Sequence, residues 1–175
     1  MSRLDSDLFL KHLSAASTVE VVLRGQLWLE SQISEAIAVN PRVSRPDLLE
    51  LDRLSFSAKT AFAVALGSLH PDVQPSLLEI NRTRNRLAHT LEYEVTQEDL
   101  DRFIRSFPPW LRPAADSIAK KTSSTIATVM PQLIALLAFT VEKQIQRLHE
   151  EQRQWLEVHK RMSALGLKET PHSAT

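Results

Sequence analysis

The sequence has no cysteine, which excludes a disulfide framework, thiol catalysis and cysteine-ligated zinc. It has only three glycines, and none of them forms a glycine-rich phosphate-binding loop. It also has no excess of either charge, because 21 Lys and Arg are balanced by 21 Asp and Glu. The molecule therefore lacks an overall positive field that would attract nucleic acid, and any contact with RNA or DNA must be local. The lack of cysteine suits a protein of the reducing cytoplasm, and we expect that location.

Leucine, alanine, glutamate, glutamine and arginine are abundant, and most of the nine prolines lie between segments of helical periodicity. No segment indicates a sheet. We therefore predict an all-α fold, a helical bundle of about five to seven helices. The bundle forms a single domain over residues 1–167, and the polar residues 168–175 are expected to be a disordered tail.

Periodicity and capping residues predict where the helices begin and end. Ser17 with Glu20, and Thr96 with Asp99, have the spacing of capping boxes, and Gly67 is suited to a C-cap. The expected helices cover residues 5–15, 17–39, 46–54, 55–67, 75–90 and 96–105, and residues 107–113 are expected to form a rigid non-helical corner. The helix over 55–67 is expected to be buried on most sides.

The C-terminal third is helical from about residue 114 to 165, with a kink or a break near Pro131. The apolar stretch 126–141 is shorter than the about 20 residues that a spanning helix needs, so we expect a buried core helix and no membrane association. Farther along, apolar residues follow a four-three alternation that Gln152 and His159 interrupt. This partial heptad predicts a long helix whose first half packs on its own domain and whose end projects or pairs.

Residues 80–90 bring together side chains with phosphate chemistry: Arg82, Arg84, Arg86 and His89, with no acid among them. Guanidinium groups match phosphate oxygens, and histidine both takes and gives protons near neutral pH. On a regular helix Arg82, Asn85, Arg86 and His89 share one side, whereas Arg84 is turned roughly 140° from His89. Arg84 and His89 would meet only if the helix unwinds or a second chain supplies one of them. The alternative is a solvated basic helix face with a histidine at its C-terminus.

Residues 84–89, Arg-Asn-Arg-Leu-Ala-His, resemble the arginine, polar residue, spacer, histidine motif of the HEPN superfamily of small helical proteins. Residues 54–67 resemble the helix that precedes this motif in the mannitol operon repressor-like branch, and the resemblance covers roughly residues 13–107. Many members are metal-independent ribonucleases that act as homodimers, with a site built from both copies. Ribonuclease toxins of the superfamily often have a tyrosine two residues after the histidine, where this chain has Leu91, and Tyr93 lies four after.

The resemblance implies that His89 transfers protons, Arg84 stabilises charge on the phosphorane and Asn85 orients the substrate or His89, without a cofactor or metal. We expect the nucleic acid to be held by Arg82, Arg86 and Lys59. Lys59 has a second interpretation, a stem lying along apolar surface. Trp110 also has two, a ring that stacks on a base or one that closes the edge of the core.

Two functions follow as hypotheses. The first is an RNA-binding protein or metal-independent endoribonuclease, a toxin or defence component with an antitoxin or regulatory protein as partner. The second is a non-catalytic regulator or protein-interaction scaffold like the mannitol operon repressor-like branch. A DNA-binding repressor has no recognition helix to support it. The six histidines have no metal-ligand spacing, so no metal site is expected.

Overall fold

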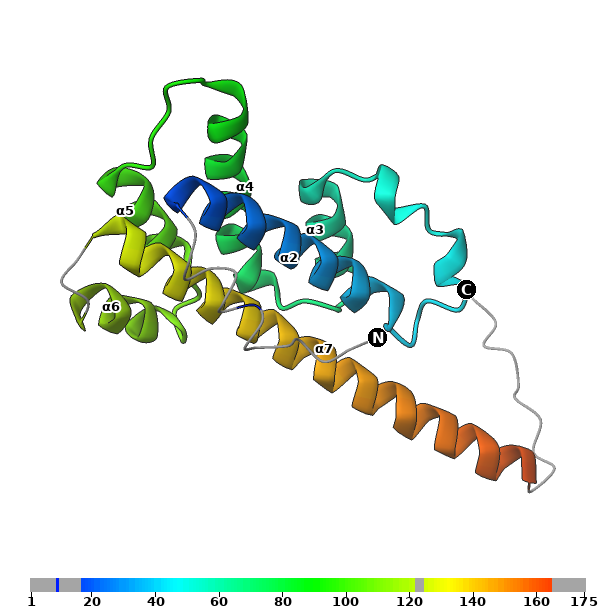
Figure 1. Ribbon diagram of the computed structural model, residues 1–175. Helices are drawn as coiled ribbons and strands as arrows, with labels where there is room; N and C mark the ends of the chain where they lie inside the picture. The colour runs from blue at the N-terminus through cyan, green and yellow to red at the C-terminus, as the bar shows by residue number, and fades with distance from the viewer. Residues whose placement is uncertain (1–8, 10–16, 122–124, 165–175) are drawn as a thin grey trace.

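The computed structural model describes residue 9 and residues 17–121 and 125–164, and these form an all-α bundle without a strand (Figure 1). This is the predicted fold class. The α-helices are α2 (Thr18–Ala38), α3 (Phe56–Ala65), α4 (Gln74–His89), α5 (Gln97–Ser106), α6 (Arg112–Lys121) and α7 (Ile126–Ala164). Three short 3-10 helices connect them, η1 (Pro46–Leu48), η2 (Leu51–Arg53) and η3 (Pro71–Val73).

Helix α2 lies at the centre of the bundle and contacts α3, α4 and α7. It begins with the predicted capping box, in which the Ser17 hydroxyl accepts from the Glu20 amide and the Glu20 carboxylate accepts from the Ser17 amide. Its crossing with α7 is close at Gly25, because a Cβ atom there would lie 2.6 Å from Cγ2 of Ile134. A residue without a side chain is therefore required at this crossing.

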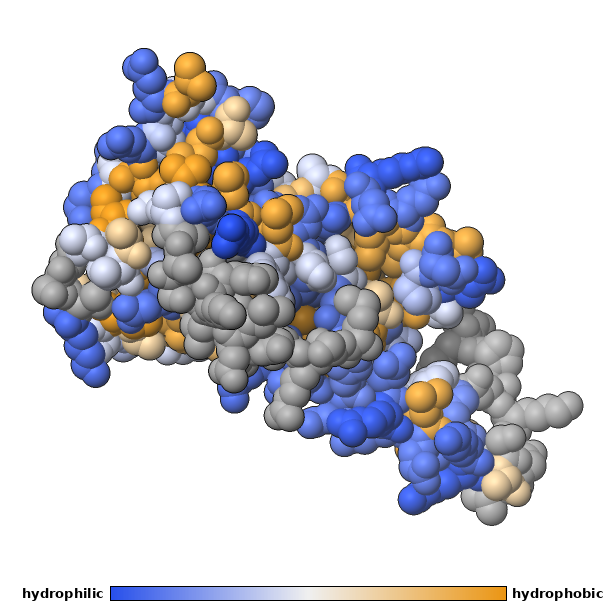
Figure 2. All heavy atoms as spheres, in the orientation of Figure 1, coloured by the Kyte–Doolittle hydropathy of each residue, from blue (hydrophilic) through white to orange (hydrophobic). Residues whose placement is uncertain are grey.

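Helix α7 runs through Pro131 as one continuous helix, so of the predicted kink or break there is no break at this residue. Its 39 residues span about 58 Å at 1.5 Å per residue. Buried residues on α7 extend as far as Leu148. Beyond that point α7 extends past the other helices (Figure 1), and a small apolar group lies on its otherwise hydrophilic surface (Figure 2). The predicted division into a packed half and a projecting half is confirmed.

By length and composition alone α7 could cross a membrane, since its most apolar 18-residue window has a mean hydropathy of 1.4. Within the bundle, however, this part of α7 packs against α2, α5 and α6 and supplies much of the core. Its fully buried residues include Leu133, Ile134, Leu137, Ala138 and Val141. These contacts are those of a core helix in a helical bundle, as predicted for residues 126–141.

Two local predictions were wrong. Residues 46–54 form η1 and η2 rather than one α-helix, because none of the residues in these two turns is buried and Asp47 pairs with Arg45. Helix α3 is buried along one side only, through Phe56, Lys59, Thr60 and Ala63. Three of its alanines, Ala58, Ala61 and Ala65, are exposed on the other side.

Other local predictions were confirmed. Gly67 ends α3 with φ +74°, in the left-handed region that favours glycine. Residues 107–111 form the non-helical corner, although Arg112 and Pro113 already belong to α6. The helix predicted over residues 5–15 and the tail over 168–175 lie outside the described residues, apart from Phe9, which packs against Trp28 and Phe139.

Candidate functional site

Helix α4 carries the basic segment and is regular to its end. Pro75 lies in its first turn, where a missing amide hydrogen costs nothing, and Leu77 and Ile80 anchor it in the core. The Ser76 hydroxyl donates to the carbonyl oxygen of Ser106 at 2.8 Å and ties the start of α4 to the end of α5. His89 is the last helical residue, where the helix dipole favours a positive charge.

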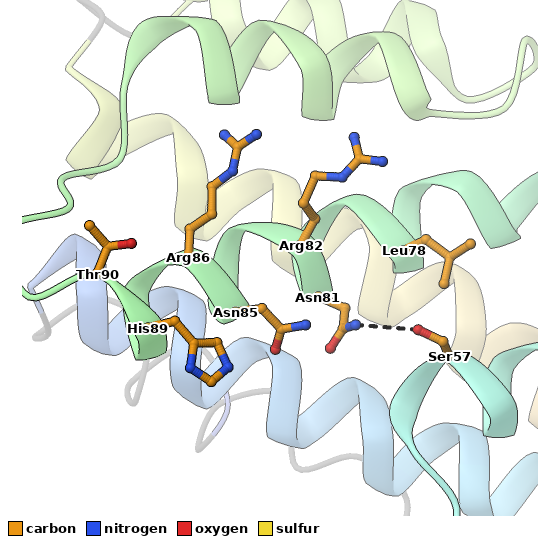
Figure 3. Close-up of a pocket in the computed structure, with 8 residues that line it drawn as sticks. All are labelled: Ser57, Leu78, Asn81, Arg82, Asn85, Arg86, His89 and Thr90. Atoms are coloured by element: carbon orange, nitrogen blue, oxygen red, sulfur yellow. Dashed lines mark hydrogen bonds between the residues drawn. The ribbon is translucent and has the colours of Figure 1, made fainter.

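An open pocket of about 560 Å³ lies along the exposed face of α4. As helical spacing predicts, four residues of the basic segment line it together: Arg82, Asn85, Arg86 and His89. In Figure 3 the two arginines extend to one side of α4, whereas Asn81, Asn85 and His89 extend to the other. The pocket therefore has a guanidinium wall and a wall of amides and imidazole.

His89 is exposed at this pocket, and its ring forms no hydrogen bond or ion pair with any residue that the structure describes. A buried histidine satisfied by helix carbonyls would have no room for a substrate. An exposed and unpartnered imidazole can instead approach a substrate hydroxyl and exchange a proton with it.

Arg84 does not line the pocket. Because α4 does not unwind, Arg84 lies on a different side of the helix from His89. Its guanidinium donates to the Oδ1 atom of Asn85 at 3.2 Å, so Asn85 links Arg84 to the pocket. Within one chain, Arg84 and His89 therefore remain on different sides of the helix.

Carboxylates that lie outside this segment, one just before it on α4 and one on α5, pair with its arginines. Arg82 pairs with Glu79 at 2.8 Å, and Arg86 pairs with Asp99 of α5 at 2.9 Å. Arg102 joins the two carboxylates, since it pairs with Glu79 at 3.3 Å and also with Asp99. The positive charge expected of this segment is therefore largely neutralised on the α5 side.

Asp99 is the buried centre of this network, with a side chain only 1% exposed. Burial alone would raise its pKa. Hydrogen bonds from the Tyr93 hydroxyl and from Thr96, together with the charge of Arg102, outweigh burial and hold the pKa of Asp99 below its ordinary value. Burial and the same Asp99 carboxylate raise the pKa of Tyr93, so this phenol stays protonated.

Lys59 does not line the α4 pocket, and neither of its predicted roles, a phosphate ligand or a stem with its charged head in solvent, is found. Its ammonium group pairs with Glu30 of α2 at 2.6 Å, and its side chain is only 5% exposed. Gln26 donates to the other oxygen of Glu30 at 3.0 Å. Burial in this ion pair removes Lys59 from the residues that can reach a phosphate, and its head does not extend to solvent either.

Four lining residues were not predicted from the sequence: Ser57, Leu78, Asn81 and Thr90. Asn81 precedes Asn85 by one helical turn, so its four-residue spacing from Asn85 was an available signal. Ser57 comes from α3 and accepts from the Asn81 amide at 3.4 Å. Only tertiary packing brings Ser57 to α4, and no sequence spacing could indicate it.

Within the described part of the chain, no group of three or more His, Asp or Glu residues is arranged to hold a metal ion. Comparisons of the chain with protein-family models, with curated proteins and with solved structures find no match. The features of the chain that indicate a function are therefore the geometry at α4 and the motif resemblance.

Proposed function

We propose that the protein binds RNA at the α4 pocket and, as a homodimer, cleaves it as a metal-independent endoribonuclease. The observation that carries this proposal is His89, which is exposed in an open pocket beside Asn85 and the guanidinium groups of Arg82 and Arg86. A proton-transfer group next to donors for phosphate oxygens is what phosphodiester cleavage requires.

In the proposed reaction, His89 takes the proton of a ribose 2'-hydroxyl, and the 2'-oxygen attacks the adjacent phosphorus. The bond from phosphorus to the 5'-oxygen breaks, and that oxygen leaves with the proton that His89 has accepted or with one from water. Arg84 stabilises the charge on the phosphorane, and Asn85 orients the substrate or His89. The products are a 2',3'-cyclic phosphate and a 5'-hydroxyl.

The proposal requires a second copy because Arg84 points away from the pocket that holds His89 of its own chain. A twofold arrangement in which two α4 helices face each other would place Arg84 of one copy near His89 of the other. It would also double the local positive charge that the ion pairs with Glu79 and Asp99 reduce. The HEPN resemblance implies such a composite site, and with it a cytoplasmic toxin or defence component that an antitoxin or regulatory protein restrains.

The test is RNA cleavage by the purified protein in the presence of EDTA. His89→Ala and Arg84→Ala should each reduce cleavage at least about a hundredfold, as expected for a proton-transfer group and a charge-stabilising donor. His70→Ala and Arg105→Ala are matched controls, since both residues are exposed and neither lines the α4 pocket. Cleavage that needs a divalent cation, or that survives both substitutions, would contradict the proposal.

A second function, a non-catalytic regulator or scaffold, is favoured by a different observation. Arg82 and Arg86 are already paired with carboxylates, as structural arginines would be, and the projecting part of α7 exposes Trp155, Leu156 and Val158. In this case α7 would carry the binding surface. If no RNA is cleaved and Trp155→Ser with Leu156→Ser abolishes self-association, this second function becomes the better account.

A further inference from the structure

Trp110 lines a second pocket. This pocket is separate from the α4 pocket, and the two have no lining residue in common. This pocket, of about 420 Å³, lies between the corner that precedes α6 and the middle of α7. Trp110 is 56% exposed, so it does not close the core edge, which was one of its two predicted roles. Its ring meets the His70 ring edge-on, with centroids 6.4 Å apart.

The interior of this pocket is apolar. Leu111, Leu136 and Phe139 form it and are themselves half-buried. Its volume is within the range of small-molecule sites, which are mostly apolar with a few polar groups that fix orientation. The Trp110 indole nitrogen forms no hydrogen bond with the described residues, so both its face and its donor are available.

The polar groups at the rim are mainly cationic. Lys143 and Arg147 lie one turn apart on α7, and no carboxylate lines the pocket. Arg147 pairs with Glu151 at 3.3 Å and donates to the Gly67 carbonyl at 3.4 Å. The exposed Lys143 ammonium forms no hydrogen bond or ion pair within the described part of the chain. Gln144 is already occupied, because its Oε1 atom accepts from the His70 amide at 2.6 Å.

We propose that this pocket binds a small apolar molecule with an anionic head group, of the kind represented by a medium-chain carboxylate. The apolar body would lie on Trp110, Leu136 and Phe139, and the head group would pair with Lys143 at the rim. The mainly apolar lining disfavours a nucleobase, which would need several hydrogen-bond partners along its edge. This site is independent of the function proposed for α4.

The test uses decanoate as the ligand and the anionic dye 1-anilinonaphthalene-8-sulfonate as a fluorescent competitor on the full chain. Decyltrimethylammonium and decanol have the same tail with a positive and a neutral head group. We expect decanoate to displace the dye at lower concentration than either of them. Lys143→Gln should weaken decanoate about fivefold, the upper range for an exposed ion pair, and leave decanol unchanged. Trp110→Ala should weaken both by about tenfold, through lost apolar contact.

Lys160→Gln is the matched control, because Lys160 is an exposed lysine of α7 that does not line this pocket. Lys143→Glu is a surface change expected to preserve the fold, and it should weaken decanoate binding more than Lys143→Gln does. It therefore keeps the proposal testable if Trp110→Ala proves unstable. Equal binding of the positive head group, or decanoate affinity that none of these variants changes, would overturn the proposal. Displacement of the dye by adenosine monophosphate but not by decanoate would also overturn it and place a base on Trp110.

Discussion

Asp99 has two roles at the start of α5: it completes the capping box with Thr96 and pairs with Arg86 of α4. Its pKa is lowered in the folded protein, so its contribution to stability is present above the unfolded value of about 4. That contribution is lost as the pH falls through the unfolded value and then the folded one. The same carboxylate that reduces the charge of the α4 pocket therefore stabilises the helix pair that carries the pocket.

Asp99→Asn should lower the free energy of unfolding at pH 7 by about 2–4 kcal/mol, because it leaves Arg86 and Arg102 without their buried partner. It should also flatten the decline in stability between about pH 5 and pH 2. Urea titrations at several pH values measure both effects. Asp52→Asn, at an exposed aspartate, is the control. If the stability of Asp99→Asn falls with decreasing pH as steeply as that of the unsubstituted protein, this role of Asp99 is contradicted.

The buried Lys59 pair gives a second prediction. Lys59→Met should cost about 1–3 kcal/mol, since it leaves the partly buried Glu30 carboxylate without its cation. Adding Glu30→Leu should restore most of the loss, because replacing both partners by apolar groups removes the unpaired charge. Thermal and urea unfolding of the single and double variants measure the coupling. Additive losses in the double variant would show that the pair does not act as a unit.

At the residue scale, the sequence predicted which side chains share a helix face but not what they pair with. Arg82, Asn85, Arg86 and His89 line one pocket, as a 3.6-residue period requires. Asp99 lies thirteen residues from Arg86, and Lys59 lies twenty-nine from Glu30. Such pairs depend on how helices pack, so no local spacing indicates them.

At the scale of elements, the capping residues predicted correctly where α2 and α5 begin. Ser17 and Thr96 both form the expected capping boxes, because these signals are local. The wrong element, residues 46–54, has a helix-start signal in Pro46 and Asp47 but no buried apolar face to hold a full helix. Local propensity therefore predicted where helices start, and tertiary burial decided which of them persist.

The crossing of α2 and α7 gives the prediction at this scale. Gly25→Ala should destabilise the protein by about 1–3 kcal/mol, although alanine is the better helix former by about 1 kcal/mol. The reason is the 2.6 Å approach of the new Cβ to Cγ2 of Ile134, a β-branched side chain with little freedom to move.

Chemical denaturation of Gly25→Ala, Ile134→Ala and the double variant checks this account. The double variant should be more stable than the sum of the two single losses, since Ile134→Ala removes the clash. A Gly25→Ala variant that is more stable than the unsubstituted protein would show that the helices can move apart at no cost.

At the scale of the whole molecule, the proposed site depends on association. One chain keeps Arg84 apart from His89, so the proposed chemistry needs two chains. Sedimentation equilibrium should give a mass twice the 19.8 kDa of one chain across micromolar concentrations. A monomer at the highest soluble concentration would exclude the composite site.

The most direct measurement of the central claim is RNA cleavage, with EDTA present, by an equimolar mixture of the His89→Ala and Arg84→Ala variants after subunit exchange. Half of the dimers would then be mixed, and each mixed dimer would hold one site with both Arg84 and His89 intact. The account predicts that the mixture regains about a quarter of the unsubstituted activity while each variant alone is inactive. A mixture as inactive as its components, or an unsubstituted protein that cleaves no RNA, would contradict it.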